Sequence, residues 1–420
     1  MKYISPLRVH HSIKLILFMV VGLMTASVFA QESWKTFGGP TSEFYVDYLP
    51  ESLPDNPERL WEIPVRGQSY GPISADEKRV VIPDAGAGQD FYYVVDRESG
   101  EELWYHSIEN DGDMDFGSAP RVRPLMKFGK LYVLNAWGIL HAVDLETGKL
   151  VWEKNIVEAF NAVVPVWGYC SSMHFIEEGL VVNPGGSEGG LVCLDPEDGS
   201  TVWTAPSDSA EYASHLVTEI DGVRQVIAYD ATSLFSTRAE DGEVLWRIPV
   251  SASSGYICPA PVKTEKGLIL VDKDNGARLY PLKDGKPVEE EKIGADSIYA
   301  ELNTPFVIGD KVYFFFYGLL TADKDSLEIL DEFYDSEPMA GSSMGYSFVD
   351  KENQRAMIYT KSGHLTLLDL SSDSPVILSE IKITEEGEIV PALIDGIIYS
   401  RDDTMGAYAY RLWDPDTENE

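Results

Sequence analysis

Cysteine is scarce in this sequence, which has three among 420 residues: Cys170, Cys193 and Cys258. At most one intramolecular disulfide can form, so a small domain held together by several disulfides is excluded. No two of the three are adjacent or at metal-ligand spacing, and no Cys-x-x-Cys-His haem-attachment motif is present. We therefore expect small buried side chains at these positions, with at least one free thiol.

Basic residues are also few: 33 Lys and Arg stand against 69 Asp and Glu, which gives a formal net charge of −36. A surface this acidic repels phosphate backbones and anionic lipids, so we expect no nucleic-acid partner. The acidic residues are spread along the chain. They indicate a solvated surface and mark no single cation site.

Long hydrophobic runs are absent after the first thirty residues. Within those thirty, Lys2, Arg8 and Lys14 precede an apolar run from Leu15 to Phe29. This pattern is typical of a signal peptide cleaved after Ala30, and no cysteine follows that would carry a lipid anchor. The sequence predicts a periplasmic or secreted protein without a membrane segment after cleavage; an uncleaved membrane anchor is the alternative.

Helical periodicity and the common catalytic motifs are missing as well. No stretch repeats its apolar residues with a helical period, which argues against an α/β fold. There is no Gly-x-Ser-x-Gly nucleophile motif, and the glycine-rich residues 185–190 lack the following helix and lysine of a phosphate loop. No two histidines stand at zinc-ligand spacing. We therefore assign no catalytic residue and no metal ligand.

The sequence does contain a recurring unit, clearest from Gly138 to Trp152, in which two alternating strands flank a Glu-Thr-Gly turn. In three copies an Asp precedes a Trp by eight residues, and the fourth copy keeps its Gly and Trp but has Arg238 in place of the Asp. Later copies lose the Trp and then the Gly. The residues assigned to this blade motif are Trp61, Asp96, Trp104, Asp144, Gly148, Trp152, Asp195, Trp203 and Trp246.

The turns recur every 41 to 51 residues or so, and each interval holds four short strands, which is typical of a β-propeller. Seven complete units run from Tyr70 to about residue 386, and a last unit supplies only three strands. The strand around Trp61 has no partner near it in the sequence. We expect it to complete the last blade, which gives eight four-stranded blades in an all-β ring and removes the exposed sheet edges.

These boundaries divide the chain into a signal peptide (1–30), an N-terminal arm (31–57), the propeller (58–412) and an acidic tail (413–420). In the repeat, the Asp is expected to bond turn amides and the Gly to adopt a left-handed conformation. The Trp is expected to fill the space between blades. All three roles are structural.

At residues 138–144, with Thr147, Gly148 and Trp152 and the copies at Trp104, Trp203 and Trp246, the chain resembles the pyrroloquinoline-quinone-like propeller repeat superfamily. This resemblance implies an eight-bladed propeller. The superfamily includes quinoprotein alcohol dehydrogenases and BamB-like outer-membrane assembly factors.

Two departures argue against a dehydrogenase. The vicinal cysteine pair of those enzymes is missing, and their calcium-binding Glu and Asn and catalytic Asp match no position here. We therefore expect a non-catalytic binding or scaffold propeller of the cell envelope that engages a protein or peptide, without a cofactor. A quinone- and calcium-dependent dehydrogenase is the alternative, and a glycan-binding or hydrolytic propeller is a third.

The first strand of each blade lines the central channel, so the residues at its start should form one mouth. A ring of Tyr70, Phe116, Tyr169, Tyr256 and Tyr346 would be suited to stack a flat ligand or grip a peptide, or would simply pack the mouth. Ser171, His215 and Asn303 stand at equivalent entries. His215 would serve as a general base only if Ser171 or Asp115 converged on it.

Overall fold

The structure is a computed structural model that describes residues 44–415, except 68, 111, 251–254 and 404–405. The predicted signal peptide (1–30), residues 31–43 of the arm and residues 416–420 of the acidic tail lie outside the described residues. Within the described part, no helix is both long and apolar enough to cross a membrane.

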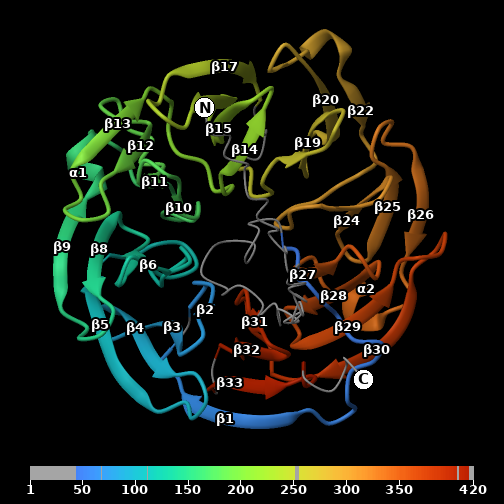
Figure 1. Ribbon diagram of the computed structural model, residues 1–420, viewed down its shortest axis with the longest axis horizontal. Helices are drawn as coiled ribbons and strands as arrows, with labels where there is room; N and C mark the ends of the chain where they lie inside the picture. The colour runs from blue at the N-terminus through green and yellow to red at the C-terminus, as the bar shows by residue number, and fades with distance from the viewer. Residues whose placement is uncertain (1–43, 68, 111, 251–254, 404–405, 416–420) are drawn as a thin grey trace, which may run out of the picture. The chain divides into compact units, whose positions relative to one another are not determined.

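Eight antiparallel sheets follow one another around a ring, with the first strand of each sheet near the centre and the last at the rim (Figure 1). The predicted eight-bladed propeller is therefore confirmed. The described residues contain two short α-helices, α1 (Ile156–Phe160) and α2 (Glu337–Ala340), and one 3-10 helix, η1 (Glu289–Glu291). The buried apolar clusters combine residues of neighbouring blades, so the core lies between the sheets.

The first four blades each contain four strands. They are β2 (Ser74–Ala75), β3 (Arg79–Gly86), β4 (Gln89–Asp96) and β5 (Glu102–Glu109); β6 (Leu125–Lys127), β7 (Lys130–Leu134), β8 (Ile139–Asp144) and β9 (Leu150–Asn155); β10 (His174–Phe175), β11 (Leu180–Val182), β12 (Leu191–Leu194) and β13 (Thr201–Ala205); and β14 (Leu216–Ile220), β15 (Val223–Asp230), β16 (Ser233–Arg238) and β17 (Val244–Pro249).

The remaining blades are less regular in sequence but keep the same order. They are β18 (Val262–Lys263), β19 (Gly267–Asp272), β20 (Gly276–Lys283), β21 (Lys286–Pro287) and β22 (Ile293–Ala295); β23 (Phe306–Ile308), β24 (Lys311–Phe315), β25 (Leu319–Asp323) and β26 (Ile329–Phe333); β27 (Gly345–Asp350), β28 (Arg355–Thr360), β29 (His364–Asp369) and β30 (Val376–Lys382); and β31 (Ala392–Ile394), β32 (Ile397–Arg401) and β33 (Gly406–Arg411) with β1 (Glu58–Pro64). In the fifth blade, which lacks the tryptophan, both β21 and β22 pair with β20.

The ring closes through β1, which pairs antiparallel with β33 from Glu58 opposite Arg411 to Pro64 opposite Gly406. Both ends of the described chain thus meet in one sheet, as predicted. After β1, the Arg66 and Gly67 amides donate to the buried Asp84 carboxylate at 2.6 and 3.2 Å. The N-terminal strand is therefore tied to blade 8 and to blade 1.

Four tryptophans of the motif form one set, Trp61, Trp104, Trp152 and Trp203, and each lies against the turn glycine of the next blade; the fifth, Trp246, instead donates to Gln225 Oε1 of its own blade at 3.1 Å. A Cβ atom at Gly148 would come within 2.8 Å of Trp104, and a Cβ at Gly100 within 2.7 Å of Trp61. The indole N–H of Trp61 donates to the Arg97 carbonyl at 2.9 Å, and the other tryptophans of this set repeat the bond one residue after each Asp position. Trp61 is thus the last copy of the repeat, found at the other end of the chain.

The turns themselves follow the expected chemistry. Asp144 Oδ1 accepts from the Thr147 amide at 2.8 Å, and Gly148 adopts φ 69°. In the sixth blade, Leu327 occupies the glycine position and still adopts φ 59°, a left-handed conformation that is strained for a leucine. The turn geometry therefore persists after its sequence signature has been lost.

Two histidines meet between blades 1 and 2, where His106 Nε2 lies 2.8 Å from His141 Nδ1. Burial lowers the pKa of His141 to about 4, and burial together with the neighbouring His141 lowers that of His106 to about 4. Both rings are therefore neutral at physiological pH, and one donates a hydrogen bond to the other.

This pair predicts acid sensitivity. The histidines have a pKa of about 6.5 in the unfolded chain and about 4 in the folded protein. Between these two pH values the unfolded chain binds protons that the folded pair does not bind, so stability falls as the pH falls. Replacing both with glutamine should remove about 3 kcal/mol of this loss. Denaturant unfolding at pH 7 and pH 4.5 measures it.

The pH comparison has an internal control. Asp90 and Glu211, whose burial raises their pKa values to about 7, act with the opposite sign, because the folded protein binds their protons first. They are present in both proteins and cancel in the difference. Parallel pH profiles for the wild-type and double-glutamine proteins would contradict the assignment.

Candidate functional site

The inner ends of all eight blades enclose one cavity of about 610 Å³. Its walls come mainly from the segments that lead into the first strands, which is the mouth expected from the sequence. The lining residues are Phe44, Tyr70, Phe116, Arg121, Trp167, Cys170, Tyr212, Ser214, Tyr256, Cys258, Lys273, Glu301, Leu302, Asn303, Thr304, Met344, Gly345, Tyr346, Ser347, Glu388 and Val390. Five of the eight predicted ligand-binding residues are among them: Tyr70, Phe116, Tyr256, Asn303 and Tyr346.

One side of the cavity is an aromatic wall formed by Phe116, Trp167, Tyr212 and Tyr256. The Trp167 ring lies at its centre, with ring centroids 6.0 Å from Phe116, 5.2 Å from Tyr212 and 4.8 Å from Tyr256. The Tyr212 hydroxyl accepts a hydrogen bond from the Trp167 amide at 3.4 Å. The entries of four consecutive blades therefore build one continuous apolar surface.

Trp167 replaces Tyr169 in the ring predicted from the sequence. Tyr169 is buried in the core between blades 2 and 3, and its hydroxyl donates to the Pro184 carbonyl at 3.0 Å. Gly168, at φ 71°, turns the chain between the two aromatics, so Trp167 faces the cavity and Tyr169 the core. Both aromatics stand at the same entry, and only the backbone turn distinguishes them.

Tyr70 and Tyr346 also line the cavity, from the segments at the start of blades 1 and 7. The Arg121 guanidinium lies over the Tyr70 ring, 4.8 Å from its centroid. Arg121 donates to the carbonyls of Ala119 at 2.7 Å and Gly117 at 2.9 Å. Its terminal nitrogens donate to carbonyls of its own loop, so the guanidinium presents a flat cationic face to the cavity rather than unpaired donors.

The two carboxylates that line the cavity are paired with lysines. Tyr256 donates to Glu301 Oε1 at 2.8 Å, and Lys273 Nζ lies 3.5 Å from the same oxygen. Glu388 Oε1 lies 2.6 Å from Lys361 Nζ. The lining is therefore mostly aromatic, with its carboxylates held at the edges by lysines.

Asn303 serves the backbone of the mouth. Its amide nitrogen donates to the carbonyls of Phe315 at 3.1 Å and Ser343 at 2.8 Å, and its oxygen accepts from the Gly345 amide at 2.8 Å. Asn303 thus ties blades 6 and 7 together. These contacts leave its side chain little capacity to bind a ligand.

Ser171 and His215 lie together, but neither lines the main cavity. Ser171 Oγ is 3.4 Å from His215 Nε2, and His174 Nδ1 donates to the Ser172 carbonyl at 3.2 Å. Burial, together with the neighbouring His174, lowers the pKa of His215 to about 3, and burial lowers that of His174 to about 4. A general base needs a pKa near the working pH, so this buried pair is poorly suited to proton abstraction.

His215 also lines a smaller pocket of about 180 Å³, together with residues that include Phe44, Thr264 and Lys351. Its Nδ1 atom has no hydrogen-bond partner in the part of the chain that the structure describes. No carboxylate is therefore placed there to orient the ring, as a catalytic triad would require. Asp115, the other partner considered from the sequence, contributes its backbone carbonyl to Arg121 at 3.2 Å.

The cysteines are free thiols in the described chain. Cys193 is buried, whereas Cys170 and Cys258 are half-buried and line the cavity. Burial raises the pKa of Cys170 to about 12, so its thiol stays protonated at neutral pH.

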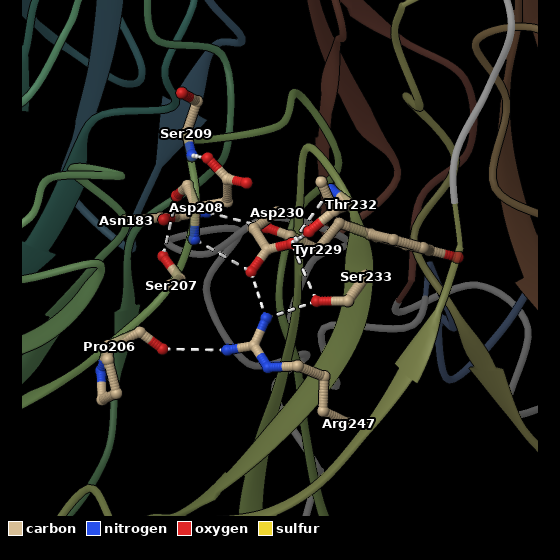
Figure 2. A network of polar contacts seen from close by, with 10 residues as sticks. All are labelled: Asn183, Pro206, Ser207, Asp208, Ser209, Tyr229, Asp230, Thr232, Ser233 and Arg247. Atoms are coloured by element: carbon tan, nitrogen blue, oxygen red, sulfur yellow. Dashed lines mark hydrogen bonds and ion pairs between the residues drawn. The ribbon is translucent and has the colours of Figure 1, made fainter.

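A buried carboxylate fixes the segment that carries Tyr212 (Figure 2). Asp230, at the end of β15, accepts from the Asp208 amide at 3.0 Å and from Ser233 Oγ at 2.8 Å, and it pairs with Arg247. Arg247 also donates to the Pro206 carbonyl at 2.9 Å. This network holds the connection between blades 3 and 4 just before it reaches the aromatic wall.

Calcium is the metal that the dehydrogenase alternative requires. Calcium takes six to eight oxygen ligands, largely carboxylates and carbonyls. Glu301 and Glu388 instead pair with lysines, and the oxygen of Asn303 accepts a backbone amide. Among residues with described positions, no group of three His, Cys, Asp or Glu side chains is arranged to hold a metal. These residues do not fit a calcium site.

A family model described as "Outer membrane protein assembly factor BamB" matches residues 54–166 and 187–412. The "Outer membrane protein assembly factor BamB" of Yersinia pestis is 24% identical over 243 residues, which are 54% of this chain and 59% of that protein. The "Alcohol dehydrogenase (quinone), dehydrogenase subunit" of Komagataeibacter europaeus is 27% identical over 234 residues, 51% of this chain and 31% of that protein. The matches therefore span less than two thirds of either relative.

The solved structure of a quinohemoprotein alcohol dehydrogenase from Comamonas testosteroni superposes with a TM-score of 0.63 at 13% identity. The match covers 91% of this chain and 80% of that one. At this identity the likeness supports the propeller fold alone.

Proposed function

Because this chain belongs to the family described as outer membrane protein assembly factor BamB, we propose that it is an exported binding or scaffold propeller of the cell envelope. Its channel mouth receives an apolar segment of a polypeptide partner. The protein holds this segment without transforming it chemically.

The aromatic wall is the observation that carries this proposal. It continues outward into exposed apolar side chains at the rim: Phe116 is 69% exposed and Val166 is 70% exposed. Large exposed apolar surfaces that lead into a concave pocket are typical of binding sites. The cavity and its rim together can hold side chains of an extended segment against Trp167.

The polar groups of the cavity favour binding over catalysis. Glu301, Asn303 and Arg121 are all committed to contacts that shape the mouth. A catalytic acid or base must be able to approach the reacting atoms and change its protonation state. Groups locked into such contacts are better suited to holding a rigid surface.

A peptide-binding measurement tests the proposal. The probe is a fluorescein-labelled Gly-Ser-Phe-Gly-Phe-Ser-Gly peptide with a C-terminal amide. We expect Trp167→Ala to weaken its binding about tenfold or more, because removing a central aromatic anchor removes a hot spot. Fluorescence anisotropy of the purified mature protein gives the Kd.

Phe128→Ala is the matched control. Phe128 is also an exposed aromatic, but it lies in the turn between β6 and β7, at the opposite end of the first strand. Its replacement should leave the Kd unchanged. Equal weakening by both substitutions, or no binding by the wild-type protein, would count against the channel mouth as the binding site.

The dehydrogenase alternative keeps some support from the sequence similarity to quinone-dependent alcohol dehydrogenases. It is weakened by the cavity carboxylates, which pair with lysines. Adding pyrroloquinoline quinone and calcium to the purified protein decides between the two. A bound-cofactor spectrum with dye-linked alcohol oxidation would replace the binding proposal with the enzymatic one.

A further inference from the structure

Arg123 is an anomaly in the channel. Its side chain is fully buried, with 0% exposure, at the entry of blade 2. Nη1 donates to the Ile73 carbonyl, but Nε and Nη2 have no hydrogen-bond partner in the described chain. One edge of the guanidinium, the pair formed by Nε and Nη2, is thus left without an acceptor.

A second fully buried arginine, Arg401, does have a counter-charge and hydrogen-bond acceptors. Arg401 is also 0% exposed, and it pairs with the Asp84 carboxylate at 3.2 Å. It donates as well to the carbonyls of Pro83 at 2.7 Å and Asp402 at 3.2 Å. Among the described residues Arg123 has no ion pair, although the chain has twice as many acidic as basic residues, so its missing partner is not explained by a shortage of carboxylates.

An unpaired buried charge is costly. Burial lowers the pKa of Arg123 to about 9, so the group is still protonated at neutral pH. Removing a cation from water without a counter-charge is strongly unfavourable. The fold therefore retains at this position a charge that the surrounding chain does not neutralise.

Arg123 lies against the wall of the main cavity. The Tyr346 side chain lines that cavity and is near enough to Arg123 for their charges to interact. The Ile73 residue that accepts from Arg123 donates its amide to the Val390 carbonyl, and Val390 also lines the cavity. Arg123 is itself fully buried and does not line the cavity, so its free edge lies behind the wall that Tyr346 and Val390 form, and a ligand reaches it once the Tyr346 side chain moves aside.

We propose that Arg123 takes the C-terminal carboxylate of a polypeptide whose last side chains are apolar and occupy the aromatic-walled cavity. The inference rests on the proposed function and names the chemistry of its ligand. Nε and Nη2 form the side of the guanidinium that binds both oxygens of a carboxylate through two parallel hydrogen bonds.

A chain terminus fits better than an internal acidic residue. A terminus enters the cavity as a single strand, whereas an internal Asp or Glu brings two strands into about 610 Å³. Capture of a terminal carboxylate is also a recurring mode of peptide recognition. Glu388, the cavity carboxylate whose charge also acts on Tyr346, is offset by Lys361, so it leaves the positive charge of Arg123 available.

The test compares two labelled peptides, Ser-Gly-Ser-Gly-Phe-Phe as the free acid and as the C-terminal amide, on the full mature protein. We expect the free acid to bind at least about tenfold more tightly, because a buried charged pair is lost in the amide. Arg123→Met should abolish the difference while leaving amide binding intact. Arg123→Lys, which keeps the charge but loses the paired donors, should restore part of it.

Lys273→Met is the matched control. It also removes one positive charge from the cavity lining but lies beside Glu301, away from Arg123's contacts. It should leave the acid-to-amide ratio unchanged. The Arg123→Met protein should fold, because replacing an unpaired buried charge with an apolar side chain of similar size is neutral or stabilising.

The outcomes separate this inference from the function on which it rests. Equal affinities for acid and amide on the wild-type protein, with binding still dependent on Trp167, would overturn the carboxylate site and leave the peptide-binding mouth in place. A ratio that survives Arg123→Met would overturn the assignment to Arg123. Failure of both peptides, and of the internal-aromatic peptide, to bind would overturn both proposals.

Discussion

Deleting residues 31–66 should leave a chain that no longer unfolds in one cooperative transition. The deletion removes β1, whose pairing with β33 completes the last blade, and Trp61, which packs on Gly100 of blade 1. Loss of the tryptophan alone is worth about 3–5 kcal/mol, and the exposed edge of β33 adds to that. A domain stable by about 5–15 kcal/mol would lose most or all of its stability. Circular dichroism during thermal unfolding measures the effect.

A circular permutant separates loss of the strand from loss of the N-terminal position. Glu58 lies opposite Arg411, so a short turn can join the end of β33 to the start of β1. A chain that begins at residue 69 and carries residues 58–66 after residue 415 should regain a cooperative transition. If the deleted chain unfolded like the full-length protein, β1 would not be the closure of the ring.

Asp230→Ala is expected to destabilise the protein by about 3–5 kcal/mol, because it removes the buried carboxylate that accepts from Arg247 and from the surrounding hydrogen-bond donors. Burial acts to raise the pKa of Asp230, but hydrogen bonds from the Asp208 amide, Arg247 and Ser233 outweigh burial and hold the pKa below its usual value. Removing the carboxylate leaves the Arg247 guanidinium without its counter-charge and four further donors without their acceptor: the Asp208 and Thr232 amides and the Thr232 and Ser233 hydroxyls (Figure 2). Urea unfolding at pH 7 gives the free-energy difference.

Asp241→Ala is the matched control for Asp230. Asp241 also pairs with an arginine of blade 4, Arg238 at 2.7 Å, but both side chains are solvent-accessible. Exposed pairs contribute at most about 1 kcal/mol. Asp230→Ala should also weaken binding of the internal-aromatic peptide, because the network holds the segment before Tyr212. Equal stability losses for both variants would contradict a central role for Asp230.

The fold could be predicted because its signals are local. The turn Gly148, the Asp144 that caps the turn and the closing Trp152 lie within nine residues of one another. Their recurrence made the blades countable even after the tryptophan had been lost. The Trp61 strand could be assigned because the last blade lacked one strand and the first strand lacked a partner, so pairing the two completes the ring. The irregular fifth blade, where β21 and β22 share β20, could not be foreseen, because its tryptophan was missing.

The candidate site was predictable only as a region. The first-strand entries did converge, and Tyr70, Phe116, Tyr256 and Tyr346 do line the cavity. Trp167 and Tyr212, which stand within two residues of the chosen entries, were missed. The signal that would have found them is the aromatic density around each entry, since Trp167 and Tyr169 differ only in which side of Gly168 they occupy.

By itself, the sequence determined the strand alternation, the turn chemistry, the eight blades and the closure by Trp61, because each depends on residues close together in the chain or on a repeat that can be counted. Only the tertiary structure decided that Trp167 faces the cavity, that Asn303 is spent on the backbone and that Arg123 is buried without a counter-charge. These properties depend on the directions of side chains from different blades, which meet only once the ring has closed. A side chain's burial and partners are set by neighbours up to hundreds of residues away, and no local pattern records them.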